Sequence, residues 1–209
     1  MIEPMERTVA AALDVAFLRA RLEARTTRGD AHFGRHANGI ARCAAAMADR
    51  FFVGATLMVF GSGAGATDAQ HNSVEYVHPV LPACRALPAL SLTNDVSTVT
   101  GILGGADPQD VYAHQLRVLG RAGDIALAFT PSPADGAATR GLQCARDAGM
   151  LTVALSAGSS PAPAIAEHTF HVEDDDALIA QELHLATYHM LWELVHIVLN
   201  HRGIAEVRP

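Results

Sequence analysis

The feature that most constrains the fold of this chain is a regular alternation of short apolar runs with helix-like segments. The runs are rich in Val, Leu, Ile and Phe and lie at residues 56–60, 88–92, 124–129, 151–156 and 168–173. Helical patterns at 67–78, 95–103, 109–121 and 134–148 separate the first four runs, and a long helix is expected from about Asp176 to His201. Apolar strands that alternate with helices are typical of a parallel sheet covered on both faces. We therefore expect an α/β fold with a five-stranded parallel sheet flanked by helices.

The N-terminal quarter has a different pattern. Apolar residues recur at helical spacing over residues 5–28, as at Val9 and Leu13, and again over residues 35–53, as at Ile40 and Met47. This predicts two N-terminal amphipathic helices before the first strand. A length of 209 residues suits a single domain. We expect residues 1–54 to form a helical pair and residues 55–209 to form the α/β core.

Composition excludes several classes of function. The formal net charge is −7 and no basic run occurs, which argues against a surface that binds nucleic acid. No apolar run approaches the roughly 20 residues that span a bilayer, and the N-terminus is acidic where a signal peptide is basic. The expected location is the cytoplasm. The chain has no Lys, so catalysis through a lysine Schiff base is excluded.

One glycine-rich segment leaves its function open when it is taken alone. Residues 60–76 read FGSGAGATDAQHNSVEY, a turn that follows a predicted strand and enters a helix with His71 and Glu75 four positions apart. A dinucleotide site is disfavoured, because the spacing is G-x-G-x-G rather than G-x-G-x-x-G. An ordinary strand-to-helix turn with a polar surface pair is the plain structural alternative. A catalytic or metal-binding pair is the third.

A second motif near the C-terminus favours the third interpretation. In IAQELHLATYHMLWELVH, residues 179–196, Gln181 and His189 are eight positions apart and can project from the same side of one helix. The combination of D-A-Q-H-x-x-x-E with Q-E-x-H-x-x-x-x-H resembles the phosphoheptose isomerases of the sugar isomerase (SIS) domain family. The resemblance covers nearly the whole chain.

The resemblance implies a fold, an activity and a set of site residues. It implies a flavodoxin-like three-layer sandwich that assembles into a homotetramer through its N-terminal helices. It implies an aldose–ketose isomerase that interconverts sedoheptulose 7-phosphate and D-glycero-D-manno-heptose 7-phosphate. Matching positions would place a zinc ion on His71, Glu75, Gln181 and His189, with Glu75 and His189 as the acid/base pair and Gln181 also in contact with substrate.

The phosphate-binding loops depart from the family pattern. The family's first loop, G-N-G-G-S, is here GSGAG, so Ser62 and Gly63 are retained as candidate substrate contacts while Gly65 replaces a phosphate-binding Ser. The second loop, S-T-S-G-N-S in the family, is here TPSPAD, which leaves Thr130 and Ser132 as candidate contacts. Asp135 stands where the family has its last Ser, and its carboxylate would repel a phosphate or accept hydrogen bonds from sugar hydroxyls.

Three functions therefore stay open at this point. The first is a metal-dependent isomerase for sedoheptulose 7-phosphate or a related sugar. The second is the same chemistry on a sugar that is unphosphorylated or differently decorated. The third is a non-catalytic sugar-binding, regulatory or protein-interaction protein on the same scaffold, which the altered phosphate loops would favour.

Overall fold

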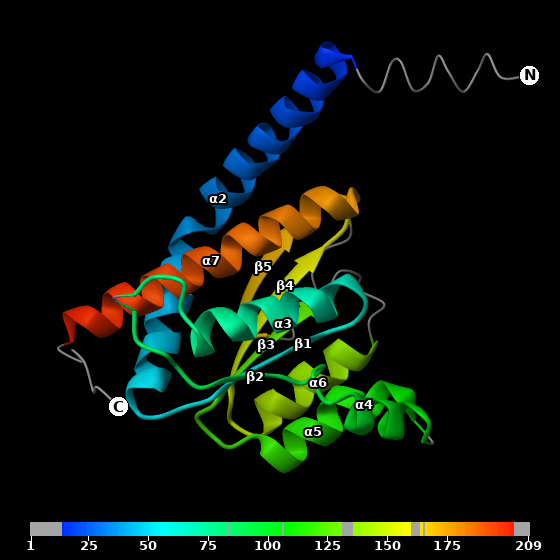
Figure 1. Ribbon diagram of the computed structural model, residues 1–209, viewed down its shortest axis with the longest axis vertical. Coiled ribbons are helices and arrows are strands. Elements are labelled where there is room, and N and C mark those ends of the chain that lie inside the picture. The colour runs from blue at the N-terminus through cyan, green and yellow to red at the C-terminus, as the bar shows by residue number, and fades with distance from the viewer. Residues whose placement is uncertain are drawn as a thin grey trace, which may run out of the picture. The chain divides into compact units, whose positions relative to one another are not determined.

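The computed structural model describes residues 14–82, 84–105, 107–130, 136–159, 164 and 166–202. The chain divides into two compact units, residues 1–36 and residues 37–209. The second unit holds the sheet and most of the helices (Figure 1). Among the described residues, no helix is long and apolar enough to cross a membrane.

The described part of the N-terminal region is one helix rather than two. Helix α2 runs without interruption from Val15 to Phe52. The sequence pattern predicts separate helices over residues 5–28 and 35–53, and the predicted break between them is wrong. Gly29 and Gly34 lie in this stretch. Glycine inside a helix costs only about 1 kcal/mol relative to alanine, and no proline interrupts this stretch. The part of the first predicted helix that precedes residue 14 lies outside the described residues.

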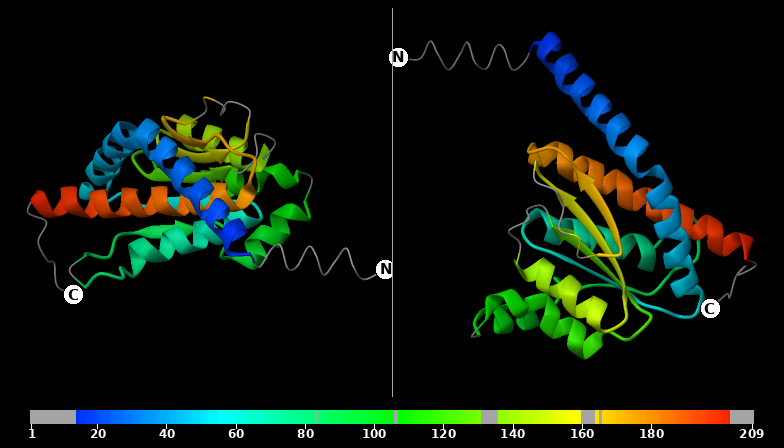
Figure 2. Two further views of the ribbon diagram at one scale, coloured as in Figure 1. Left: turned by 90° about the horizontal axis from the view of Figure 1, so that it is seen from above. Right: turned by 180° about the vertical axis from the view of Figure 1, so that it is seen from behind.

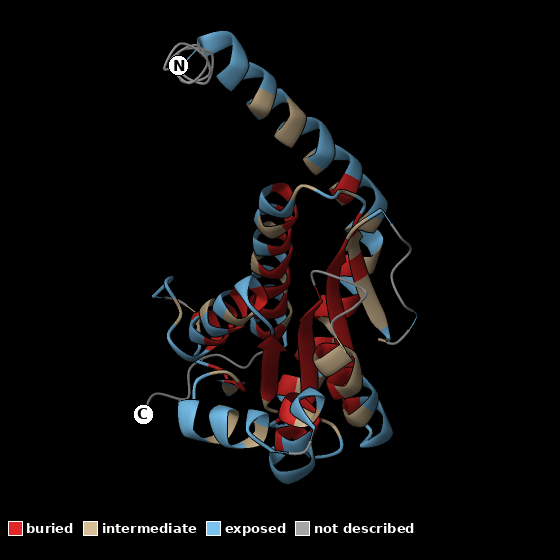
Figure 3. Ribbon diagram, turned by 90° about the vertical axis from the view of Figure 1, so that its right-hand side faces the viewer, coloured by how far each residue is buried: buried red, intermediate tan, exposed pale blue. Residues whose placement is uncertain are grey.

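The five predicted strands are confirmed and form one parallel sheet in the order β2-β1-β3-β4-β5. All five strand predictions fall within one residue of the observed bounds at each end. The strands are β1 (Leu57–Gly61), β2 (Ala89–Ser91), β3 (Ile125–Thr130), β4 (Leu151–Ala157) and β5 (His168–Val172). Every residue of β1, β3 and β4 is buried, which explains why these strands appear in the sequence as continuous apolar runs (Figure 3).

Helices cover both faces of this sheet, as the two further views show (Figure 2). Helices α3 and α7 contact one face, and α6, with α5 packed beside it, covers the other. Two shorter elements, α4 and η1, lie between β2 and α5 in the chain. The bounds are α3 (Ala64–Val77), α4 (Val96–Leu103), η1 (Pro108–Asp110), α5 (Val111–Leu119), α6 (Gly136–Asp147) and α7 (Ala177–His201).

Alternation along the strands assigns side chains to the two faces. Phe60 of β1 belongs to the apolar cluster under α5 and α6. Gly141 allows α6 to approach Phe60, because a Cβ at position 141 would lie 2.7 Å from the Phe60 ring. Phe129 of β3 pairs with Gly61 and faces the opposite way, with its ring centroid 5.7 Å from that of Tyr188 on α7. This α7 face of the sheet supports the candidate site.

Candidate functional site

The candidate site lies where the carboxyl ends of β1 and β3 meet the helices. The chain leaves β1 toward β2 on one side and later enters β3 on the other side of β1. In open α/β sheets, such a change of direction produces a crevice at the carboxyl ends of the strands, and ligands bind there. The loop from β1 to α3 lies at this crevice.

Two glycines that flank this loop, Gly61 at the end of β1 and Gly65 in the first turn of α3, are required by close approach of the backbone to β3. A Cβ at Gly61 would lie 2.9 Å from Cβ and O of Phe129, and a Cβ at Gly65 would lie 3.0 Å from Phe129 Cβ. Gly63 has a positive φ of 57° and precedes the first residue of α3. The hydroxyl of Tyr112 donates a 2.5 Å hydrogen bond to the Gly61 carbonyl and lies 3.4 Å from Ser62 Oγ. The loop is thus shaped by packing.

Helix α3 starts at Ala64 and carries both members of the His–Glu pair. His71 Nε2 lies 3.3 Å from Glu75 Oε1, as expected for positions one helical turn apart. Glu75 is buried, with 11% of its side chain exposed, while 43% of the His71 side chain is exposed. The carboxylate of the pair is therefore largely shielded from solvent, whereas the imidazole is partly exposed.

Helix α7 brings His189 to the same place. The ligand atoms of His71, Glu75 and His189 all lie within 4.8 Å of one another. His189 Nε2 is buried and has no hydrogen-bond partner among the described residues. An unpartnered ring nitrogen beside a second imidazole and a carboxylate suits a bound divalent cation, and two His with one carboxylate is a donor set that zinc accepts. The residues present therefore fit a metal ion.

Gln181 reaches the site through a different residue. Its Nε2 donates a 3.0 Å hydrogen bond to Oδ1 of Asp68, which is buried on the first turns of α3. Burial raises the pKa of Asp68, while the hydrogen bond from Gln181 and the charge of His71 lower it. Because the amide nitrogen is held by the carboxylate, the Gln181 carbonyl oxygen is left to accept from a substrate or to bind a metal.

Two side chains of α7 take part that the sequence motifs did not indicate. Tyr188 is fully buried, and its hydroxyl lies 2.5 Å from Nδ1 of His71. Trp192 Nε1 donates a 2.8 Å hydrogen bond to the backbone carbonyl of Glu75. Positions 181, 188 and 192 recur at helical spacing, so they share the side of α7 that meets α3. That periodicity was the available signal, although it equally suits ordinary core residues.

A pocket of about 160 Å³ has Asp68 and Gln181 in its lining, whereas the residues of the His–Glu–His cluster are not among those that line it. Its lining includes three carboxylates, from Asp68, Asp174 and Asp175, and no arginine among the described residues. His184, also in the lining, donates from Nε2 to the Ser156 carbonyl at 3.0 Å, and burial lowers the pKa of its ring to about 4. The imidazole is therefore neutral at pH 7, and the pocket has an acidic lining.

The predicted substrate contacts fall into two groups. Ser62 and Gly63 lie in the loop before α3, and Thr130 is the last residue of β3, where its buried hydroxyl donates to the Leu155 carbonyl at 3.3 Å. Ser132 and Asp135 lie outside the described residues.

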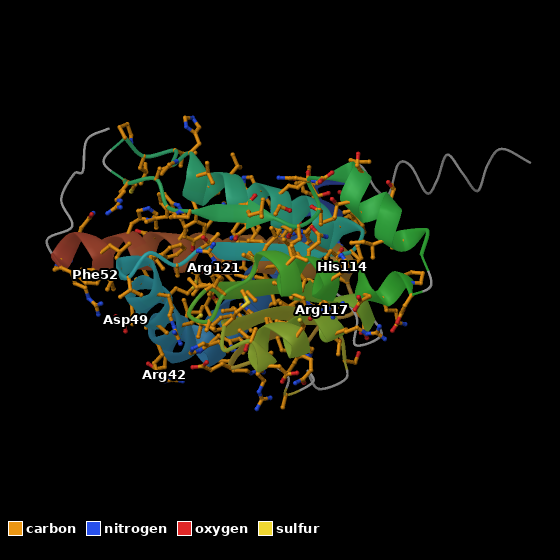
Figure 4. The ribbon with its side chains drawn as sticks, turned by 90° about the horizontal axis from the view of Figure 1, so that it is seen from below. Arg42, Asp49, Phe52, His114, Arg117 and Arg121 are labelled. Atoms are coloured by element: carbon orange, nitrogen blue, oxygen red, sulfur yellow. The ribbon has the colours of Figure 1, made fainter. Side chains whose placement is uncertain are left out.

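Two arginines near β3 are labelled in Figure 4. Arg117 on α5 is ion-paired with Asp110, and Arg121 precedes β3. Neither arginine lines the pocket.

Comparison with known proteins agrees with this arrangement. Residues 26–157 match the SIS domain family, which is more than half of the chain. The chain belongs to the SIS domain family. Within this family, it is 32% identical over 199 residues to the phosphoheptose isomerase of Desulfovibrio desulfuricans, covering 95% of this chain and 93% of the relative. It is 34% identical over 165 residues to that of Halorhodospira halophila, covering 77% of this chain and 83% of the relative.

Solved structures show the same SIS fold. A phosphoheptose isomerase from Francisella tularensis superposes with a TM-score of 0.80 at 24% identity, covering 88% of this chain and 98% of the other. The phosphoheptose isomerase from Neisseria gonorrhoeae superposes with a TM-score of 0.76 at 20% identity, covering 86% of this chain and 97% of the other. These likenesses confirm the predicted α/β fold, and the curated relatives identify this SIS chain as an isomerase of the phosphoheptose isomerase type.

Proposed function

We propose that this protein interconverts sedoheptulose 7-phosphate and D-glycero-D-manno-heptose 7-phosphate with Glu75 and His189 as its acid/base pair. The observation that carries the proposal is the convergence of Glu75, His71 and His189 from two helices, with ligand atoms within 4.8 Å of one another. The names of the curated relatives supply the substrate class.

Conversion of the ketose to the aldose moves one proton between neighbouring carbons. Glu75 would remove the proton from C1 while His189 protonates the oxygen on C2, which gives an enediol. Glu75 would then return its proton to C2, and the imidazole would take up the proton of the C1 hydroxyl as the aldehyde forms. The opposite direction uses the same groups in reverse, and no atoms are gained or lost.

A metal ion is the second part of the proposal. His71, Glu75 and His189 would hold zinc, with the carbonyl oxygen of Gln181 as a further ligand. When bound, zinc polarises the sugar carbonyl and stabilises negative charge on the enediol oxygens. Engagement of Glu75 with a cation would weaken this carboxylate as a base, so the ligand and base roles compete at that residue.

A second candidate substrate is a sugar without the terminal phosphate. Three carboxylates in the pocket lining and the absence of a side chain at Gly65 favour it, because a phosphate dianion beside Asp174 or Asp175 would be repelled. Ser62, Gly63, Thr130 and Ser132 are the contacts we propose for the substrate end. Asp135 is the residue that would distinguish hydroxyl from phosphate.

Assembly and location are further proposals. We infer a homotetramer that uses the N-terminal region, residues 1–54. Apolar side chains at the start of α2 support this inference, since Val15, Phe17, Leu18 and Leu22 are each more than half exposed. Exposed apolar side chains that gather on one surface often mark a contact between proteins. The cytoplasm and the absence of nucleic-acid and membrane partners are predictions from the sequence.

Turnover of defined sugars tests the function. Metal-free protein would be incubated with sedoheptulose 7-phosphate and with sedoheptulose, each with and without added zinc, and the products followed by NMR. We expect zinc-dependent conversion of the phosphorylated sugar and a loss of about 100-fold or more in kcat for Glu75→Gln, since acid/base catalysis contributes about 10² to 10⁴. His78→Ala is the matched control, because His78 is exposed at the end of α3.

The outcomes separate the candidates. Conversion of sedoheptulose alone would favour the unphosphorylated substrate. Binding of either sugar without conversion under any condition would overturn the isomerase proposal and favour the sugar-binding or regulatory alternative.

A further inference from the structure

Tyr188 occupies an unusual position behind the His71–Glu75–His189 cluster. Its side chain is fully buried, yet its hydroxyl lies 2.5 Å from His71 Nδ1, on the side of the imidazole away from Glu75. The two rings of the cluster lie around the phenol, with centroid distances of 5.8 Å to His71 and 4.9 Å to His189. The phenol therefore fixes His71 at the ring nitrogen that does not face the cluster.

The chemistry of the two ring nitrogens makes this contact more than packing. In neutral histidine, one nitrogen carries the proton and the other has a free lone pair, and the partner of one nitrogen decides the state of the other. A phenol hydroxyl can both donate and accept, so it can pair with Nδ1 in either tautomer. Phenylalanine at this position could do neither.

Different tautomers of His71 suit the contacts of the free protein and the binding of a metal ion. Without a metal, a protonated Nε2 of His71 can donate a hydrogen bond to Glu75 Oε1, which lies 3.3 Å away. The unprotonated Nδ1 then accepts a hydrogen bond from the Tyr188 hydroxyl. Binding of zinc through Nε2 requires a lone pair on that nitrogen, so the proton must be on Nδ1, where the Tyr188 oxygen accepts it.

We propose that Tyr188 is a positioning residue that holds His71 in place and lets its imidazole exchange tautomers when a divalent cation binds. This inference rests on the proposed metal-dependent function. It assigns to Tyr188 a role that none of the ligand residues can supply, because each of them faces the cluster rather than Nδ1. The effect reaches the metal only through His71.

The test is zinc binding by the metal-free protein, measured by competition with a chromophoric chelator. Tyr188→Phe keeps the aromatic ring and removes the hydroxyl, and we expect zinc affinity to fall by about 10-fold to 100-fold, the usual effect of losing a hydrogen bond to a metal ligand. The matched control is Tyr76→Phe. Tyr76 is also fully buried, lies on α3 beside Glu75, and its hydroxyl has no hydrogen-bond partner among the described residues. The zinc affinity of the Tyr76→Phe variant should equal that of the wild type.

A second measurement needs no substitution at Tyr188. In protein labelled with ¹⁵N-histidine, the ¹⁵N shifts of the His71 ring report which nitrogen carries the proton, with the signals assigned by their absence in His71→Asn. We expect the Nε2–H tautomer in metal-free protein and Nδ1–H after zinc is added. Tyr188→Phe should lose this defined metal-free tautomer, whereas Tyr76→Phe should keep it.

Three results would overturn the inference. They are equal zinc affinity in Tyr188→Phe and wild-type protein, an equal loss in both Phe variants, and an Nδ1–H tautomer already present in the metal-free wild type. Wild-type protein that binds no zinc would instead contradict the metal part of the proposed function. In that case, the tautomer in metal-free protein still tests the hydrogen bond from Tyr188.

Discussion

The amide nitrogen of Gln181 donates a 3.0 Å hydrogen bond to the carboxylate of Asp68, which joins helix α7 to the start of helix α3 across the candidate site. Asp68 is buried, so the contact fixes which end of the amide faces the pocket. The orientation of Gln181 therefore depends on a residue outside the predicted ligand set.

Replacement of Asp68 by Ala should release this amide. We expect kcat/KM for the preferred sugar to fall by about 10-fold or more, since a lost hydrogen bond to a charged partner is worth about 1.5–3 kcal/mol. Asp68→Asn keeps an acceptor oxygen and should retain more activity than Asp68→Ala. Steady-state kinetics of both variants check this order, and equal activity of Asp68→Ala and wild type would show that the contact does not position Gln181.

Acid should destabilise the fold through His184. Burial lowers the pKa of its ring to about 4, whereas an unfolded histidine titrates near 6.5. Between these values the unfolded chain binds more protons, so the free energy of unfolding should fall by up to about 3 kcal/mol as the pH drops from about 6.5 to 4. This contribution is fully present above the higher value.

Urea unfolding of wild type and His184→Gln between pH 4 and 7.5 isolates this contribution. Glutamine keeps a donor for the Ser156 carbonyl and does not titrate, so its stability should depend less steeply on pH over this range. The same dependence in both proteins would mean that other groups, such as His168, account for the acid sensitivity.

The destabilisation caused by alanine at Gly61 and at Gly65, which flank the loop before α3, should follow the contacts that a Cβ would make. Gly61→Ala should destabilise most, because its Cβ would lie 2.9 Å from backbone and Cβ atoms of neighbouring residues, and Gly65→Ala should destabilise less. We expect losses of about 1–3 kcal/mol, as for overpacking elsewhere. Gly101→Ala is the control. Gly101 lies inside α4, and a Cβ added there would have no atom within 4 Å, so alanine should stabilise the protein by up to about 1 kcal/mol.

Thermal and urea unfolding would measure this ranking. The reverse order for Gly61 and Gly65 would contradict the packing of this loop against Phe129. A side chain at position 65, such as that of Ser, would bring its Cβ 3.0 Å from Phe129 Cβ, so β3 would have to shift by a few tenths of an ångström.

The sheet was predictable because its strands β1, β3 and β4 are buried along their whole length and appear as continuous apolar runs, such as residues 124–129 for β3. The His71–Glu75 pair was predictable because both residues share one helix. The continuity of α2 was not predictable, since the apolar pattern is clear over residues 5–28 and 35–53 but does not show whether the residues between them continue the helix. The contacts of Asp68 and Tyr188 were also not predictable, because they depend on how α7 packs on α3 rather than on any spacing in the sequence.

The central claim is proton transfer by Glu75, and deuterium incorporation tests it most directly. Sedoheptulose 7-phosphate would be incubated in D₂O with zinc-loaded wild type or Glu75→Gln, and the aldose product examined by NMR and mass spectrometry. We predict deuterium at C2 of the product with wild type, and neither product nor exchange above background with Glu75→Gln. Equal incorporation by both proteins, or neither product nor exchange with wild type under conditions in which it binds the sugar, would contradict the assignment.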